Sequence, residues 1–196
     1  MNIFRICIVL SLSALMVSIS ACSALTQSDK PATKRWWLEP YLAEVEAKPL
    51  GMPVIVVLSV TAIPGLDTDR ILTLSDDAQL SQFAGARWVD HLPELLTSLI
   101  ERSLQATGQF EVVTERAASR PGNCHLGMEL REFFADIGPG GALTTVRVAI
   151  KSNFRCETSA PVVFQSGSSK PIASERMSAV VAAFQQAMDS VTLDIV

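Results

Sequence analysis

The chain has 196 residues and a formal net charge of −4 at pH 7, and 48% of its residues are hydrophobic. A modestly acidic chain without a basic stripe is a poor candidate for binding nucleic acid. The length suits one domain with a substantial core, preceded by a short leader segment.

The first 21 residues are built like a secretion signal. Arg5 precedes a charge-free, largely apolar stretch at 6–19, which is shorter than the roughly 20 apolar residues of a membrane span. The segment closes with Ile-Ser-Ala-Cys at 19–22, which resembles the lipobox of bacterial lipoproteins. This resemblance implies that residues 1–21 are removed and that Cys22 is lipidated. The alternative is an ordinary secretion signal cleaved after an Ala-x-Ala-like site.

Residues 22–34 are polar, contain Pro31 and are expected to be the lipidated N-terminus and a tether to the domain. Several acyl chains, palmitate among them, would hold the membrane permanently, because each buried methylene contributes about 0.8 kcal/mol. In Gram-negative lipoproteins a Ser such as Ser23 permits transfer to the outer membrane. We therefore expect a lipid anchor on the periplasmic face of the outer membrane, with the inner membrane as the alternative.

Residues 35–196 are predicted to form a single domain, and three candidate strands occur in its first half. Residues 35–38 are short and aromatic, and residues 54–63 are nearly all apolar and β-branched, as in a central strand buried on both faces. Residues 70–74 are the third candidate, whereas residues 75–85 look irregular.

Two amphipathic helices are predicted. The first has Asp90 as its candidate N-cap, Pro93 in its first turn and Gly108 at its end, and the second starts near Ala173. The apolar residues of both recur at helical spacing and are interpreted as core that packs on a sheet. They are Leu92, Leu95, Leu96, Leu99, Ile100 and Leu104 in the first helix, and Met177, Val180, Val181, Phe184, Met188 and Val191 in the second.

A long β-hairpin is predicted around the turn sequence Gly-Pro-Gly-Gly at 138–141. When two strand-like runs are folded about Gly140, apolar residues of one parity face each other. These pairs are Leu126 with Phe154, Leu130 with Ile150, and Phe134 with Val146.

The same register places Cys124 opposite Cys156, within reach of a disulfide. An even pair of cysteines in an exported chain is typical of such a bond, and two buried free thiols are the alternative. A metal site is not expected here, because the two cysteines lack a local His or Cys partner pair.

The remaining segments complete the predicted fold. A short strand is expected at 110–114, and residues 159–170 look loop-like, with at most a short strand at 162–165. Two long helices on a mostly antiparallel or mixed sheet make a two-layer α+β sandwich.

Signals for catalysis or metal binding are sparse. His91 and His125 stand alone and are interpreted as surface residues, and the acidic residues between Asp67 and Asp77 lack the Gly and Glu of a calcium loop. The chain has no Gly-x-Ser-x-Gly elbow and no His-Glu-x-x-His motif. We therefore expect no catalytic residue, no metal and no cofactor, and hence a protein that is not an enzyme.

Several segments together resemble a known family. Residues 66–71 (Leu-Asp-Thr-Asp-Arg-Ile) and 86–92 (Ala-Arg-Trp-Val-Asp-His-Leu) are similar to the Leu-Asp-x-x-x-Ile and Arg-Trp-x-x-x-Leu patterns of the ABC-type transport auxiliary lipoproteins, the family of the paraquat-inducible protein C lipoproteins. Further segments fit in the same order, at 36–38, 108–113, 130–134 and 180–184. Two features depart from the family: it more often has tyrosines at 36–37, and the cysteine pair is not one of its hallmarks.

The resemblance implies a non-catalytic subunit of a lipid transport system that supports membrane integrity. Its expected partners are a mammalian-cell-entry domain protein that carries lipid across the periplasm and the associated membrane transporter; homo-oligomerisation is left open. The candidate docking residues are Asp67, Arg70, Arg87 and Trp88, and the loops around them and the hairpin tip are the expected docking surface. The alternative is that these residues only stabilise the fold, with Trp88 packing the first helix against the sheet.

Two other classes of function stay open. A lipid-binding shuttle or chaperone would need an apolar cavity of at least a few hundred Å³. A lipid-anchored envelope hydrolase would need a nucleophile, a base and an acid converging in one pocket.

Overall fold

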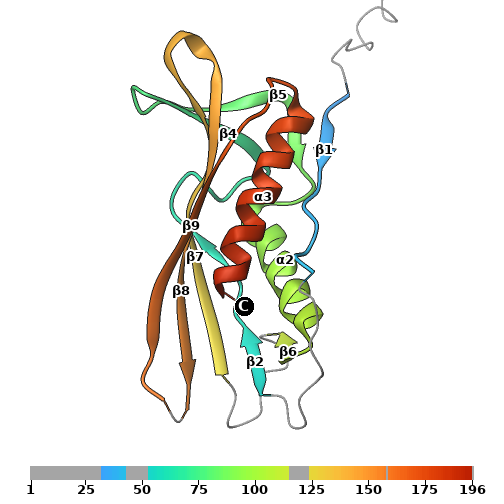
Figure 1. Cartoon of the computed structure of the whole chain (residues 1–196), viewed down its shortest axis with the longest axis vertical. Coiled ribbons are helices and arrows are strands. Elements are labelled where there is room, and N and C mark those ends of the chain that lie inside the picture. The colour runs from blue at the N-terminus through green and yellow to red at the C-terminus, as the bar shows by residue number, and fades with distance from the viewer. Residues whose placement is uncertain (1–31, 43–52, 115–123, 158, 196) are drawn as a thin grey trace, which may run out of the picture. The chain divides into compact units, whose positions relative to one another are not determined.

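A long antiparallel hairpin forms the middle of the sheet (Figure 1). The computed structural model describes residues 32–42, 53–114, 124–157 and 159–195. Strands β7 (Cys124–Ile137) and β8 (Leu143–Cys156) run the length of this hairpin, joined by a turn in which Gly140 and Gly141 adopt positive φ angles of 79° and 84°. Only glycine adopts such angles without strain, so the predicted turn is confirmed.

The predicted hairpin register is confirmed over its first half and wrong over its second. Cys124 faces Cys156, and the two apolar pairs nearest to them are also as predicted. The register then shifts at a β-bulge between Leu130 and Glu132, so that Phe134 faces Arg147 instead of Val146. A bulge inserts one extra residue into one strand, and alternation along a sequence does not locate it.

Other strands extend this hairpin on both sides into a mixed sheet. On one side β9 (Val162–Pro171) pairs antiparallel with β8. On the other side β2 (Val54–Val57), β3 (Thr61–Ala62) and β4 (Arg70–Ser75) pair in turn with β7, all parallel to it.

Three strands complete the sheet beyond these. Strand β6 (Glu111–Thr114) confirms the short strand predicted at 110–114, and it pairs parallel with β2. Strand β5 (Leu80–Trp88) pairs antiparallel with β4, and β1 (Lys34–Trp36) pairs parallel with β5.

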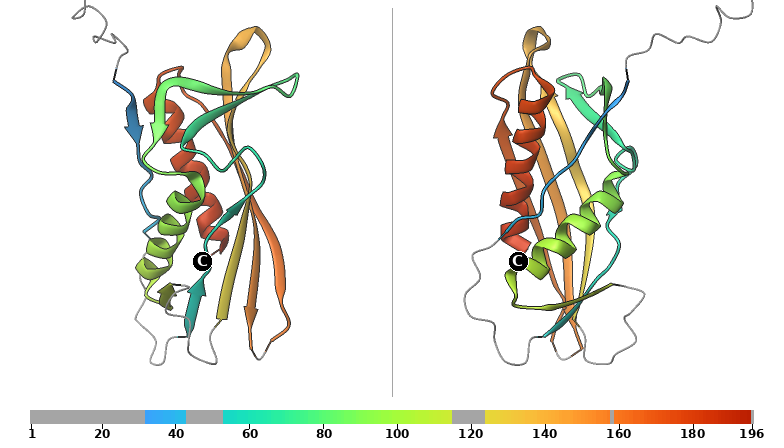
Figure 2. Two further views of the ribbon diagram at one scale, coloured as in Figure 1. Left: turned by 180° about the vertical axis from the view of Figure 1, so that it is seen from behind. Right: turned by 90° about the vertical axis from the view of Figure 1, so that its right-hand side faces the viewer.

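Two helices cover one face of this sheet, which gives the predicted two-layer α+β arrangement (Figures 1 and 2). They are α2 (Leu92–Thr107) and α3 (Met177–Ile195). Every residue of the predicted stripe of α2 is buried, as are Val180, Phe184, Met188 and Val191 of α3. Burial of these stripes against the sheet is the main force that fixes the helices in place.

The helix ends differ slightly from the predictions. His91, not Asp90, is the residue at the N-cap of α2, and Asp90 Oδ1 instead accepts a hydrogen bond from the His91 backbone N–H at 2.9 Å. Gly108 ends α2 in the left-handed conformation, as predicted. Helix α3 begins at Met177, four residues after the predicted start at Ala173.

Three strand predictions need correction. The apolar stretch 54–63 is divided between β2 and β3, because the Val60 N–H turns towards α2 and donates to Thr97 Oγ1 at 2.8 Å. Residues 75–85 were expected to be irregular but contain most of β5. Strand β9 spans ten residues, not the four expected at most. Neither strand shows the apolar alternation of a half-buried strand, because exposed residues include Ser81 and Gln82 in β5 and Gln165 and Ser169 in β9.

Candidate functional site

Asp69 holds an ion-pair cluster where β4, β5 and the start of α2 meet. Arg87 Nη1 donates to both carboxylate oxygens of Asp69, at 2.8 and 2.9 Å, and Arg70 Nε lies 3.7 Å from Oδ1. The backbone carbonyl of Asp69 also accepts a hydrogen bond from the backbone N–H of Trp88 at 2.8 Å. The structure therefore brings the predicted residues Arg70 and Arg87 together around Asp69, which was not among the predicted docking residues.

The charge of Asp69 is stabilised by this arrangement. Its side chain is 18% exposed, and the hydrogen bond from Arg87 holds the pKa of its carboxyl below the ordinary value. The positive charges of Arg87 and Arg70 also lower the pKa of the Asp69 carboxyl. The sequence alone does not indicate the ion pairs of Asp69, because Arg70 and Arg87 are brought together by the pairing of β4 with β5.

Asp67 does not join this cluster but contacts His91. Their side chains meet at 3.0 Å between Oδ1 and Nδ1, and both are exposed. The hydrogen bond to Asp67 raises the pKa of the His91 imidazole. The Glu94 carboxylate is close enough that the three residues could each direct one atom at a cation, but all three are exposed, and exposed groups of this kind are common without an ion.

Trp88 is fully buried, so its side chain is unable to contact a partner in the folded protein. Its ring makes edge-on contacts with Phe133 of β7 and Phe184 of α3, with centroids 5.6 and 5.4 Å apart. The fold therefore supports a structural role for Trp88, in one core cluster with the buried residues of α2 and with Phe184 of α3. Its role at this site is to hold the adjacent Arg87 in position.

The predicted docking segments lie at one end of the sheet (Figure 2). The tip of the β7–β8 hairpin projects beyond the N-terminal end of α3, and the turn between β4 and β5 projects sideways at about the level of that end. Asp69 immediately precedes β4, at the base of the β4–β5 hairpin. Two exposed turns and a set of partly exposed charges are thus carried on a rigid sheet.

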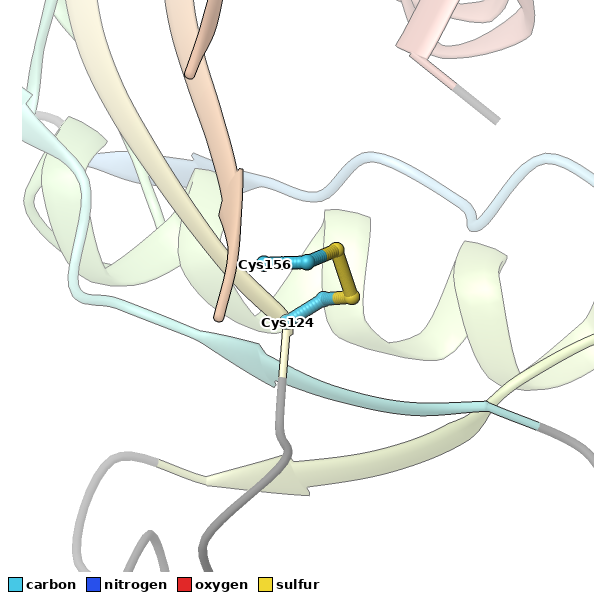
Figure 3. The surroundings of a disulfide bond; sticks show 2 residues. All are labelled: Cys124 and Cys156. Carbon is cyan, nitrogen blue, oxygen red and sulfur yellow. A yellow bond between two sulfur atoms is a disulfide. The ribbon is translucent and has the colours of Figure 1, made fainter. Parts of the chain in front are cut away.

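The disulfide lies at the other end of the hairpin. Cys124 and Cys156 are bonded, with Cα atoms 4.1 Å apart, at the ends of β7 and β8 that are remote from the turn (Figure 3). Each strand is therefore fastened to the other at both ends, by the glycine turn and by the bond.

An apolar hollow of about 240 Å³ opens beside this end, on the helix-bearing face. Its walls come from the sheet, from the ends of both helices and from the segment after α2, and include Ile55, Leu104, Phe110, Phe154, Phe164 and Ile195. The hollow was not predicted, because its residues lie far apart in the sequence. It is smaller than the roughly 300–1,000 Å³ of usual small-molecule sites, which weighs against a whole lipid as its occupant.

The remaining predicted site residue, Cys22, lies outside the described residues. Among the residues that are described, no helix is both long enough and apolar enough to cross a membrane.

Comparison with known proteins identifies a family. The model of the ABC-type transport auxiliary lipoprotein component matches residues 38–196. No curated protein matches the chain.

Two solved structures share the fold. Protein XCC0632 from Xanthomonas campestris, a DUF330 family protein, superposes with a TM-score of 0.68 at 19% identity and covers 83% of this chain and 92% of its own. A second, described only as an uncharacterized protein, has a TM-score of 0.60 at 13% identity and covers 82% of this chain and 97% of its own. At these identities the likeness establishes the fold alone.

Proposed function

Since the chain belongs to the family of ABC-type transport auxiliary lipoprotein components, we propose that it is the envelope-anchored, non-catalytic subunit of a lipid transport system that contributes to membrane integrity. In this role it docks on a periplasmic mammalian-cell-entry domain protein that works with a membrane transporter. The observation that carries the proposal is the family match, which extends over nearly the whole of the folded domain.

The charged groups around Asp69 support docking at this end of the sheet. Arg87 uses one of its terminal nitrogens for Asp69, and a guanidinium has five N–H donors, so donors are left for a partner. Arg70 and Asp67 are exposed enough to offer a cation and a carboxylate beside them. Mixed charges of this kind orient a partner and speed its association more than they add affinity.

The anchor completes the proposal. Lipid on Cys22 would hold the protein at the periplasmic face of the outer membrane, and Ser23 favours that membrane over the inner one. An extended chain spans at most about 3.6 Å per residue, so the segment from Cys22 to Thr33 would keep the start of β1 within about 40 Å of the lipid.

Site-specific photocrosslinking tests this function. Photoreactive residues are introduced at Asp67 and, at the hairpin tip, at the exposed Ala142, with Gln105 on the exposed side of α2 as the matched control. We expect the first two positions to capture a mammalian-cell-entry domain protein and the control position not to do so. Capture of bulk lipid or peptidoglycan alone would contradict the proposal and favour the shuttle or the hydrolase.

A further inference from the structure

Strand β9 leaves one border of the sheet open. It pairs with β8 along one side, and no strand of the described residues pairs along its other side. It is ten residues long, whereas the border strands β1 and β6 have three and four residues. Long open borders are templates for strand pairing, and proteins usually shorten them or protect them with charges or proline.

The unprotected part of β9 is its first half. Lys170 and Pro171 occur at the far end, whereas Val162 and Val163 at the near end are 54% and 57% exposed. In Figure 1 this near end lies at the outer border of the sheet. Exposed valines on the open edge of a strand favour aggregation unless another molecule covers them.

Two hollows flank this half of β9, one on each face of the sheet. On the helix-bearing face, Val162 and Phe164 line the apolar hollow described above. On the opposite face, Val163 and Gln165 border a second, shallow hollow with Arg131 and Lys151, and Phe164 also reaches its edge. Since side chains alternate along a strand, a strand added beside β9 would direct successive side chains into the two hollows.

The face around the second hollow carries an excess of positive charge, from Arg131 and Lys151 against Glu129. Lys151 is exposed and faces Gln165 across the β8–β9 ladder and Glu129 across the β7–β8 ladder, but it makes no ion pair among the described residues. Arg131 contributes a further guanidinium, which pairs with Glu129. An acidic side chain beside Lys151 therefore complements this face.

We propose that Val162–Ser166 binds an extended segment of a protein partner by strand addition, with a large apolar side chain in the inner hollow and an acidic side chain beside Lys151. The apolar hollow and the backbone of β9 supply affinity, and the alternation of apolar and acidic residues supplies specificity. A second copy of this chain fits less well, because pairing of its β9 with this one would place its own Lys151 near Lys151 of the first copy. This surface lies at the opposite end of the hairpin from Asp69 and goes beyond the docking function proposed above.

A designed peptide tests this site on the exported full chain held in lipid nanodiscs. The probe is the capped peptide Thr-Val-Glu-Phe-Glu-Val-Thr, which places apolar residues on one face of a strand and glutamates on the other. A peptide of the same composition in the order Val-Phe-Val-Thr-Glu-Glu-Thr has no such faces and is the control. Binding is measured by fluorescence anisotropy, with empty nanodiscs as the blank, and its location is measured by amide hydrogen exchange.

We expect the alternating peptide to bind several-fold more tightly than the rearranged one and to slow exchange at residues 162–166. Lys151→Glu should weaken its binding about fivefold, as loss of an exposed ion pair predicts, and should favour a peptide with lysines in place of the glutamates. Lys34→Glu, at the other border of the sheet, should leave binding unchanged.

The proposed site would be overturned by no binding at millimolar peptide or by equal binding of both peptides. Equal affinity of the Lys151→Glu and Lys34→Glu variants, or exchange protection away from β9, would also overturn it. Crosslinking of one copy to another through Val163 would also overturn it, in favour of self-association. None of these results depends on the crosslinking test at Asp67, so the two proposals fail independently.

Discussion

Cys124 and Cys156 face each other across the β7–β8 ladder at the end remote from Gly140, and their sulfur atoms are bonded. The pairing of β7 with β2 also begins at Cys124, which faces Ile55. The next apolar pair of the ladder, Leu126 and Phe154, lines the apolar hollow. The disulfide therefore restrains the end of the sheet that carries the hollow and the start of β9.

Removal of this bond should destabilise the domain. Replacing Cys124 and Cys156 by serine is expected to lower the free energy of unfolding by about 3–4 kcal/mol, because the unfolded chain regains the entropy of an open loop across 32 positions. Urea unfolding of both proteins under non-reducing conditions measures the difference.

Thiol counting on the exported protein gives the matched check. No thiol should react in denaturant before reduction, and two should react after it, since Cys7 leaves with the signal and Cys22 carries lipid. Two reactive thiols without reduction would show that the bond does not form in the cell.

Trp88 should contribute more to stability than any exposed tryptophan. Trp88→Ala removes a fully buried ring from its contacts with Phe133 and Phe184 and is expected to cost about 3–5 kcal/mol. Trp37→Ala is the control, because Trp37 is 47% exposed and its described ring partner is the Arg102 guanidinium, at 5.0 Å, a contact worth about 0.5–1 kcal/mol. Thermal unfolding compares the two variants, and equal losses would contradict the core role of Trp88.

The Asp69 ion pair should make stability depend on pH in the acid range. Its folded-state pKa is lowered, so its contribution is fully present above the ordinary value near 3.9 and is lost as the pH falls through the lowered pKa. Asp69→Asn should therefore cost about 1 kcal/mol at pH 7 and progressively less below pH 4. Urea unfolding between pH 2.5 and 7 measures this, with Asp76→Asn in an exposed turn as the control. A constant difference between wild type and Asp69→Asn would refute the ion-pair explanation.

The contact between His91 and Asp67 should be visible in the titration of the imidazole. Asp67→Asn removes the negative charge and weakens the hydrogen bond that raise the pKa of His91, so that pKa should fall, and more than in Glu94→Gln, which removes a more distant charge. Because the folded pKa is raised, any stabilisation is present below the ordinary value of about 6.5 and lost as the pH rises through the raised pKa. NMR titration of the ring protons measures the shift; an unchanged pKa in Asp67→Asn would exclude the contact in solution.

The parts of the fold that the sequence predicted are those with a strong apolar period. The stripes of α2 and α3 and the facing cysteines follow from spacing, because burial on one face imposes the same parity or helical period on the residues. Strand β5 was not predicted and β9 was predicted only in part. Both lie towards the borders of the sheet, where polar residues such as Gln82 and Ser169 are tolerated.

The candidate sites were predicted less well, for a topological reason. The ion pair of Asp69 with Arg87 depends on the pairing of β4 with β5, and the apolar hollow gathers residues as far apart as Ile55 and Ile195. Neither arrangement leaves a local pattern in the chain. Trp88, in contrast, belongs to a local sequence motif that resembles the family. Its role in the structure is to pack in the core, not to contact a partner.

Lipidation of Cys22 should decide where the protein resides. One acyl chain gives only marginal membrane binding, whereas the several chains of a bacterial lipoprotein attach it permanently. Cys22→Ala should therefore leave an unprocessed or soluble product that takes up no labelled palmitate, and Cys7→Ala, within the signal, should be labelled like the wild type. Metabolic labelling followed by separation of the inner and outer membranes measures both the lipid and the location. Equal labelling of wild type and Cys22→Ala would refute the anchor, and labelled wild type in the inner membrane would refute sorting by Ser23.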